Sequence, residues 1–96
     1  MAESIVIVSA ARTPIGGMLG DFSALAAHQL GSVAIKAAVE RTGVRGDAVD
    51  EVLMGNCLMA GQGQAPARQA TLGAGLPQST GAVTLSKMCG SGMRTM

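Results

Sequence analysis

The chain has 96 residues, a formal net charge of +1 and an apolar fraction of 48%, but its only aromatic residue is Phe22. This length allows one domain at most, and its core has to be built from small and aliphatic side chains. The near-neutral charge, without a basic stripe or an aromatic stacking surface, argues against nucleic-acid binding. We therefore expect no nucleic-acid partner.

Membrane and export signals are also absent from the sequence. The longest apolar run, residues 5–8 extended by Ala10 and Ala11, is far too short to span a bilayer. The first four residues lack the basic region of a secretory signal, and the acidic Glu3 argues against a transit peptide. We expect a cytoplasmic protein with no membrane partner.

The sequence contains two cysteines, Cys57 and Cys89, and one histidine, His28. In a reducing compartment a disulfide between the two cysteines is improbable, so we expect both to be free thiols. Two distant thiols and one imidazole do not have the spacing of a zinc site, and we expect no bound metal.

The first half of the chain predicts a strand, a helix and a second strand. Residues 5–8 form a continuous β-branched run, which is typical of a central parallel strand covered on both faces. A helix is expected from about Ser23, with Ser23 or Asp21 as its cap and Gly43 at its end. Residues 51–54 predict the second buried strand, joined to the first by a right-handed crossover. Residues at helical spacing form the core-facing stripe of this helix: Leu30, Val33, Ala34, Ala37 and Ala38.

The second half predicts a further helix and strand before Cys89. A short helix is expected to begin at Pro66 and to stop before Gly75, with Ala65 as a poor cap. Residues 81–85 predict a third strand, and residues 91–96 predict the start of a helix that the end of the chain truncates. The whole pattern indicates an α/β fold with buried, mostly parallel strands.

Cys89 is followed by Gly90, Ser91 and Gly92, between a predicted strand and a predicted helix. The positive end of a helix dipole and nearby backbone N–H groups favour the thiolate, which is the form that attacks carbonyls. Glycines let a substrate approach the backbone, whose N–H groups can stabilise an oxyanion. The arrangement resembles a nucleophile elbow. Composition alone favours the alternative, a buried and inert thiol in a glycine turn.

Other candidate residues have weaker support. The loop Gly61-Gln62-Gly63-Gln64 fits neither the phosphate loop nor the dinucleotide fingerprint, and we interpret it as a flexible connection. Arg12 and Arg68 could bind phosphates, although single arginines near loops are usually solvated or paired. We expect His28 to be a surface residue rather than a base, and Cys57 to be a small core side chain.

Four segments taken together resemble the thiolase family in order and spacing. They are residues 5–16 (IVIVSAARTPIG), 52–56 (VLMGN), 61–70 (GQGQAPARQA) and 88–93 (MCGSGM). The resemblance covers essentially the whole chain, and Cys-Gly-Ser-Gly in this setting is the family's nucleophile signature. It implies a layered fold of two similar α/β halves, of which residues 1–96 form an incomplete N-terminal domain with a truncated helix after the nucleophile.

The resemblance also implies an activity, that of an acetyl-CoA acetyltransferase. In such enzymes the residue matched by Cys89 takes an acyl group from a coenzyme A thioester, with its own backbone N–H as an oxyanion donor. The carbanion of a second acetyl-CoA then attacks the acyl-enzyme, and degradation runs in reverse. The implied substrates are acetyl-CoA and acyl-CoA, without a separate cofactor. Full-length members are usually dimers or tetramers.

Several catalytic groups of the family have no match in this sequence. Family members are several times longer, and their activating histidine, second cysteine, Asn-His pair and coenzyme A loops lie downstream. His28 matches none of them. We expect an N-terminal fragment that turns over negligibly by itself. Two alternatives stay open: a truncated product that associates with full-length subunits or misfolds, and a related condensing enzyme that also loads acyl groups on a cysteine.

Overall fold

Two parallel strands form the centre of the fold. β1 (Glu51–Gly55) and β2 (Gly81–Leu85) pair in register, with Glu51 opposite Gly81 and Gly55 opposite Leu85. The structure, a computed structural model, describes residues 3–96. The pairing confirms two of the three strands predicted from the sequence and their parallel orientation.

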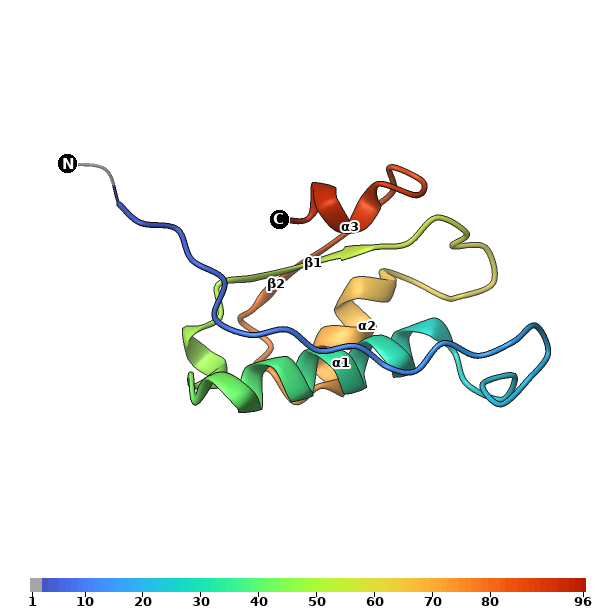
Figure 1. Ribbon diagram of the computed structural model, residues 1–96, viewed down its shortest axis with the longest axis horizontal. Coiled ribbons are helices and arrows are strands. Elements are labelled where there is room, and N and C mark those ends of the chain that lie inside the picture. The colour runs from blue at the N-terminus through green and yellow to red at the C-terminus, as the bar shows by residue number, and fades with distance from the viewer. Residues whose placement is uncertain (1–2) are drawn as a thin grey trace.

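The helices lie on both sides of this pair of strands (Figure 1). They are α1 (Ala27–Thr42), α2 (Pro66–Gly73) and α3 (Ser91–Arg94), with a short 3₁₀ helix, η1 (Gly46–Ala48), between α1 and β1. α2 contacts both strands and α1, whereas α3 contacts β1 from the other side. Within residues 3–96, no helix combines the length and the apolar character needed to cross a membrane.

α1 begins later than the sequence predicts and ends where it predicts. Its N-cap is Ala26, so the prediction of Ser23 or Asp21 as the cap is wrong. The Ala26 backbone N–H donates to Oε1 of Gln29 at 2.7 Å, so a side chain inside the helix satisfies the N–H of the cap residue. Gly43 ends the helix with φ of 70°, a conformation that glycine adopts without strain.

The predicted core-facing stripe of α1 is only partly correct. Val33 is 61% exposed, because α2 covers one side of the helix and residues 3–96 leave the other side open. The remaining members are half buried: Leu30, Ala34, Ala37 and Ala38.

α2 supplies the best-packed part of the core. Pro66 is its first residue, and Ala65 precedes it with φ of 45° and no side-chain cap, as the sequence predicts. Ala67 is 1% exposed, Ala70 is 2% exposed and Thr71 is fully buried. This part of the core therefore consists of small side chains, as expected of a sequence with a single aromatic residue.

Small residues also allow α1 and α2 to approach closely. The Ser32 hydroxyl on α1 lies 2.9 Å from the His28 carbonyl oxygen of its own helix and 3.0 Å from the Ala70 carbonyl oxygen of α2. A Cβ at Gly31 would lie 3.3 Å from Cβ of Ala70, so this contact leaves little room for a larger residue. The helix pair is thus held by backbone proximity and one bridging hydroxyl.

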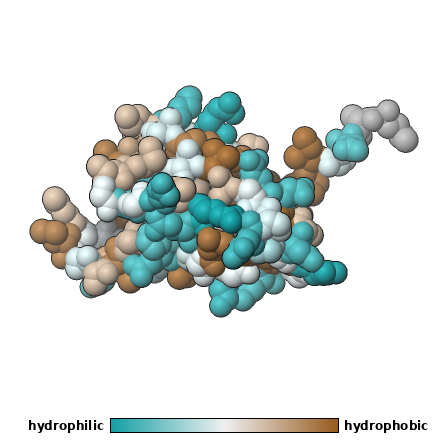
Figure 2. Space-filling view, turned by 180° about the vertical axis from the view of Figure 1, so that it is seen from behind, coloured by the Kyte–Doolittle hydropathy of each residue, from teal (hydrophilic) through white to brown (hydrophobic). Residues whose placement is uncertain are grey.

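The first predicted strand is not a strand in this structure. Residues 5–8 have no strand pairing, and their exposure ranges from 69% at Val8 to 99% at Ile5. Figure 2 shows this end of the chain standing clear of the body with apolar side chains. A continuous apolar run predicts that both faces are covered, but a strand also needs a hydrogen-bonding neighbour. Residues 3–96 provide none at this position, so the prediction of a buried central strand and of the crossover from it is wrong here.

The close packing of α1 on α2 leads to a prediction about Gly73. A Cβ at Gly73 would overlap the Ser32 hydroxyl, which would have to leave the Ala70 carbonyl. Gly73→Ala should therefore lower the free energy of unfolding by about 1–3 kcal/mol, despite the higher helix propensity of alanine. Urea unfolding of the full-length protein measures this. Adding Ser32→Ala should recover part of the loss, and a Gly73→Ala variant as stable as the parent would contradict the packing described.

Candidate active site

Cys89 lies on a short loop between β2 and α3. Ser86, Lys87 and Met88 separate it from the end of β2, and Gly90 is the N-cap of α3. The side chain of Cys89 is exposed. The alternative that composition alone favours, a buried thiol in a glycine turn, is therefore wrong as to burial, and the reactivity of Cys89 stays a prediction.

The backbone of this loop, residues 87–91, turns sharply. Met88 has φ of 45°, a left-handed conformation that is strained for a residue with a Cβ. The Gly90 N–H donates to the Lys87 carbonyl at 3.0 Å, and the Ser91 N–H donates to the Met88 carbonyl at 3.1 Å. We call residues 87–91 the Cys89 loop. Its strained residue is the one just before the cysteine.

The Ser91 side chain connects both ends of the Cys89 loop. Its hydroxyl accepts a hydrogen bond from the Lys87 N–H at 2.8 Å and donates one to the Met88 carbonyl at 2.7 Å. Ser91 is only 7% exposed. Sequence reasoning assigned no role to Ser91, although serine hydroxyls commonly bond to backbone groups within a few residues, and its place beside two glycines is the signal that could have identified it.

The end of β1 packs directly against the Cys89 loop. A Cβ at Gly55 would lie 2.5 Å from Cβ of Ser91, so only glycine fits where α3 meets the strand. Just beyond, the Cys57 thiol donates to the Met88 carbonyl at 3.3 Å and lies 3.8 Å from the Ser91 hydroxyl. Cys57 is half buried rather than a core residue, so the prediction for it is corrected: it is a neighbour of the loop that carries Cys89.

Two cationic side chains flank the loop. Lys87 and Arg94 line an open hollow of about 250 Å³ together with Gly90 and Met93. Cys89 is not among the residues that line this hollow. Its exposed side chain is open to a ligand approaching from solvent.

The two arginines singled out in the sequence lie elsewhere. Arg68 donates to the Thr80 carbonyl at 2.8 Å and to the Gln78 carbonyl at 2.9 Å, so its guanidinium stabilises the turn before β2. Arg12 is exposed and donates to the neighbouring Thr13 carbonyl at 3.1 Å. Both arginines are paired with backbone oxygens, as single arginines near loops usually are.

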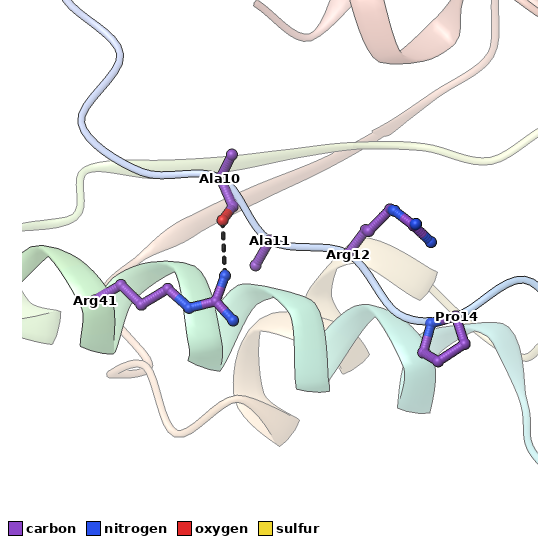
Figure 3. Close-up of a pocket in the computed structure, with 5 residues that line it drawn as sticks. All are labelled: Ala10, Ala11, Arg12, Pro14 and Arg41. Carbon is purple, nitrogen blue, oxygen red and sulfur yellow. Dashed lines mark hydrogen bonds between the residues drawn. The ribbon is translucent and has the colours of Figure 1, made fainter.

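Arg12 also lines a hollow of about 700 Å³ (Figure 3). The other cation there, Arg41, donates to the Ala10 carbonyl at 2.9 Å and so holds the N-terminal segment against α1. Figure 3 shows the Arg12 side chain pointing away from Arg41. Because the two guanidinium groups do not converge, the hollow lacks the geometry of an anion site.

Amide side chains bond to the loop at residues 61–64, for which the sequence predicts a flexible connection. Asn56 donates through Nδ2 to Oε1 of Gln62 at 2.6 Å, and Gln69 donates through Nε2 to the Gln64 carbonyl at 2.6 Å. His28, expected to be a surface residue rather than a base, is half buried. It lines a separate hollow of about 120 Å³ with Gly55.

Comparison with known proteins shows the family. A family model described as "Thiolase, N-terminal domain" matches residues 5–96. The chain therefore belongs to the thiolase family, as its four motifs indicate.

Curated relatives agree over nearly the whole chain. The chain is 64% identical over 94 residues to the mitochondrial acetyl-CoA acetyltransferase of Xenopus tropicalis. The aligned region covers 98% of this chain and 22% of the relative. It is 58% identical over 92 residues to the cytosolic acetyl-CoA acetyltransferase of Gibberella zeae, and the aligned region covers 96% of this chain and 23% of that relative. The chain thus spans about a fifth of the length of these relatives. Relatives occur in both compartments, which leaves the compartment of this protein open.

Solved structures confirm the fold. A thiolase from Ascaris suum, solved in complex with coenzyme A, superposes with a TM-score of 0.89 at 40% identity, covering 92% of this chain and 23% of that one. An acetyl-CoA acetyltransferase from Syntrophomonas wolfei gives a TM-score of 0.86 at 43% identity, and the match covers 94% of this chain and 23% of that one. The α/β arrangement of residues 3–96 is thus part of a thiolase fold.

The difference in exposure between the two cysteines leads to a prediction. Iodoacetamide should alkylate Cys89 of the full-length protein at least about ten times faster than Cys57, because the Cys57 thiol is half buried and bonded to a carbonyl. Peptide mapping by mass spectrometry at increasing times measures both rates. In a Cys89→Ser variant the slow labelling of Cys57 should persist unchanged, and equal rates at the two thiols would contradict the geometry.

Proposed function

We propose that Cys89 is the acyl-accepting nucleophile of an acetyl-CoA acetyltransferase, acting within the full-length polypeptide. The observation that carries this proposal is the exposed thiol on a strained loop directly before the amino end of α3. Relatives up to 64% identical that are named acetyl-CoA acetyltransferases support the reaction class. A related condensing enzyme is the weaker alternative, because the relatives reported above carry the transferase name.

The first step would load an acyl group on Cys89. The thiolate attacks the carbonyl carbon of an acyl-CoA thioester, a carbon–sulfur bond forms, and the oxyanion of the tetrahedral intermediate accepts hydrogen bonds from backbone N–H groups. Collapse breaks the bond to the coenzyme A sulfur, which leaves as a thiolate and takes up a proton. The exchange of one thioester for another is close to balanced, so neither side of this step is strongly favoured.

The second step would form the carbon–carbon bond. The carbanion of a second acetyl-CoA attacks the acyl carbon, and Cys89 leaves as a thiolate while acetoacetyl-CoA forms; cleavage runs in reverse. The resemblance assigns activation of the nucleophile to a histidine, the acid and base role to a second cysteine, and stabilisation of the enolate to an Asn-His pair. None of these groups has a match in this sequence. The proposal therefore places the acylation half of the site in these residues.

The substrates, assembly and location are part of the same proposal. Acetyl-CoA and acyl-CoA are the proposed substrates, supported by the names of the relatives and by the coenzyme A in the Ascaris suum structure. That the full-length protein is a dimer or tetramer stays a prediction. That it needs no separate cofactor also stays a prediction. A cytoplasmic location also stays a prediction, with a cytosolic relative in its favour and mitochondrial relatives against it.

One observation favours a second, non-catalytic role for the 96-residue chain by itself. Its N-terminal run is largely exposed, with Ile7 at 75% and Val6 at 70%, and exposed apolar strand-forming segments promote association. Such a chain would associate with full-length subunits or misfold. Co-purification of the tagged chain with full-length protein tests this role, and a chain that stays monomeric alone and in the mixture would exclude it.

The proposed nucleophile leads to a prediction about the acyl-enzyme. In the full-length protein Cys89→Ser should abolish acetylation by acetyl-CoA, because a serine hydroxyl is not ionised at neutral pH and forms an ester that is a poorer acyl donor. Cys57→Ser should leave acetylation largely intact, since a hydroxyl can still donate to the Met88 carbonyl. Mass spectrometry of the quenched protein locates the acetyl group. An acetyl label on Cys57 would overturn the assignment.

A further inference from the structure

We propose that the Ser91 hydroxyl and the Cys57 thiol are positioning groups for acyl transfer. They hold the peptide between Met88 and Cys89 in the orientation that turns the Cys89 N–H toward the oxyanion. This inference rests on the proposed function, because it concerns how the acylation step is assisted. Neither side chain needs to touch the substrate.

The Met88 carbonyl is the centre of the arrangement. It accepts hydrogen bonds from the Ser91 N–H at 3.1 Å, the Ser91 hydroxyl at 2.7 Å and the Cys57 thiol at 3.3 Å. A carbonyl has two lone pairs, so these donors occupy its accepting capacity and fix its direction. The oxygen is therefore aimed toward Ser91 and the end of β1.

The direction of this carbonyl determines that of the Cys89 N–H. A peptide unit is planar and trans, so its C=O and its N–H point in opposite directions. With the Met88 oxygen held toward Ser91 and Cys57, the N–H of Cys89 faces the other way. Among the hydrogen bonds of residues 3–96, none has the Cys89 N–H as its donor. It is thus a free, oriented donor on the residue that carries the attacking sulfur.

The strain at Met88 explains why the loop needs to be held. A left-handed conformation at a residue with a Cβ persists only when its surroundings impose it. The Ser91 hydroxyl binds the backbone on both sides of this conformation, at the Lys87 N–H and at the Met88 carbonyl. One buried oxygen therefore spans the strained residue.

Packing keeps the Ser91 hydroxyl in place. Cβ of Ser91 lies against Gly55, and Ser91 is 7% exposed, so water has little access to replace the hydroxyl. Ser91→Ala keeps this Cβ contact and removes both side-chain hydrogen bonds. Cys57 contributes less than Ser91, because a thiol is a weak donor.

Two reactions of the same sulfur separate positioning from a general loss of structure. Acylation by acetyl-CoA passes through an oxyanion, whereas alkylation by iodoacetamide displaces iodide and forms none. In the full-length protein, Ser91→Ala should lower the rate of Cys89 acetylation about 10- to 100-fold and change the alkylation rate of Cys89 by less than about threefold. Rapid-quench mass spectrometry measures both rates.

Matched variants complete the experiment. Thr95→Val removes a hydroxyl from the same helix that donates only to the Gly92 carbonyl, at 2.7 Å, and it should leave both rates unchanged. Cys57→Ala should show a smaller selective loss of acetylation, which Cys57→Ser restores because a hydroxyl can donate in place of the thiol. If Ser91→Ala fails to fold, the comparison of Cys57→Ala with Cys57→Ser still tests the inference.

The outcomes distinguish this inference from the proposed function. A parent protein that never becomes acetylated on Cys89 would overturn the proposed function and, with it, this inference. A parent that is acetylated, with a Ser91→Ala variant acetylated equally fast, overturns the positioning role alone. Equal losses in the rates of acetylation and alkylation also overturn the positioning role. Such losses would mean that the Cys89 thiol is less accessible or less ionised, and not that the Cys89 N–H is misdirected.

Discussion

The contact between Gly55 and Ser91 is the constraint on which the rest of the site depends. A Cβ at Gly55 would lie 2.5 Å from Cβ of Ser91, so α3 can reach the strand only where the strand has no side chain. From there the Ser91 hydroxyl bonds to the Lys87 N–H and the Met88 carbonyl. Each such bond contributes about 0.5–1.5 kcal/mol net, and the left-handed conformation of Met88 costs about 1–2 kcal/mol. The two hydrogen bonds are therefore of the right size to hold the strained turn.

The parallel pairing of the strands explains why these groups meet. The carboxyl ends of parallel neighbours lie at the same edge of a sheet, and this edge is where α/β proteins commonly bind ligands. Cys57 follows β1, and the Cys89 loop follows β2, so the register that sets Gly55 opposite Leu85 brings them together. Cys57 and Ser91, which are 34 positions apart in sequence, thus share the Met88 carbonyl as their acceptor. The small-residue packing of α2 against both strands supports this edge from the opposite side.

The sequence predicts the elements whose signals are local. A short apolar run predicts β1, Pro66 and Gly75 bracket α2, and Gly43 ends α1, because proline and glycine restrict or free the backbone at their own positions. The placement of Cys89 before a helix follows in the same way. Features that depend on residues far away in the sequence cannot be predicted from a local pattern. The strand predicted at residues 5–8 needs a neighbour that residues 3–96 do not supply. The role of Cys57 emerges only when β1 and β2 are paired, whereas the hydrogen bonds of Ser91 are local.

The central claim is that the Cys89 loop carries both the attacking sulfur and an N–H directed at the oxyanion. A crystal structure of the full-length protein trapped as its acetyl-enzyme tests it most directly. The account predicts an acetyl group on Cys89 whose carbonyl oxygen lies about 2.7–3.1 Å from the Cys89 nitrogen, with the Met88 carbonyl still bonded to the Ser91 hydroxyl. An acetyl oxygen turned away from that nitrogen, or a reversed peptide between Met88 and Cys89, would contradict it.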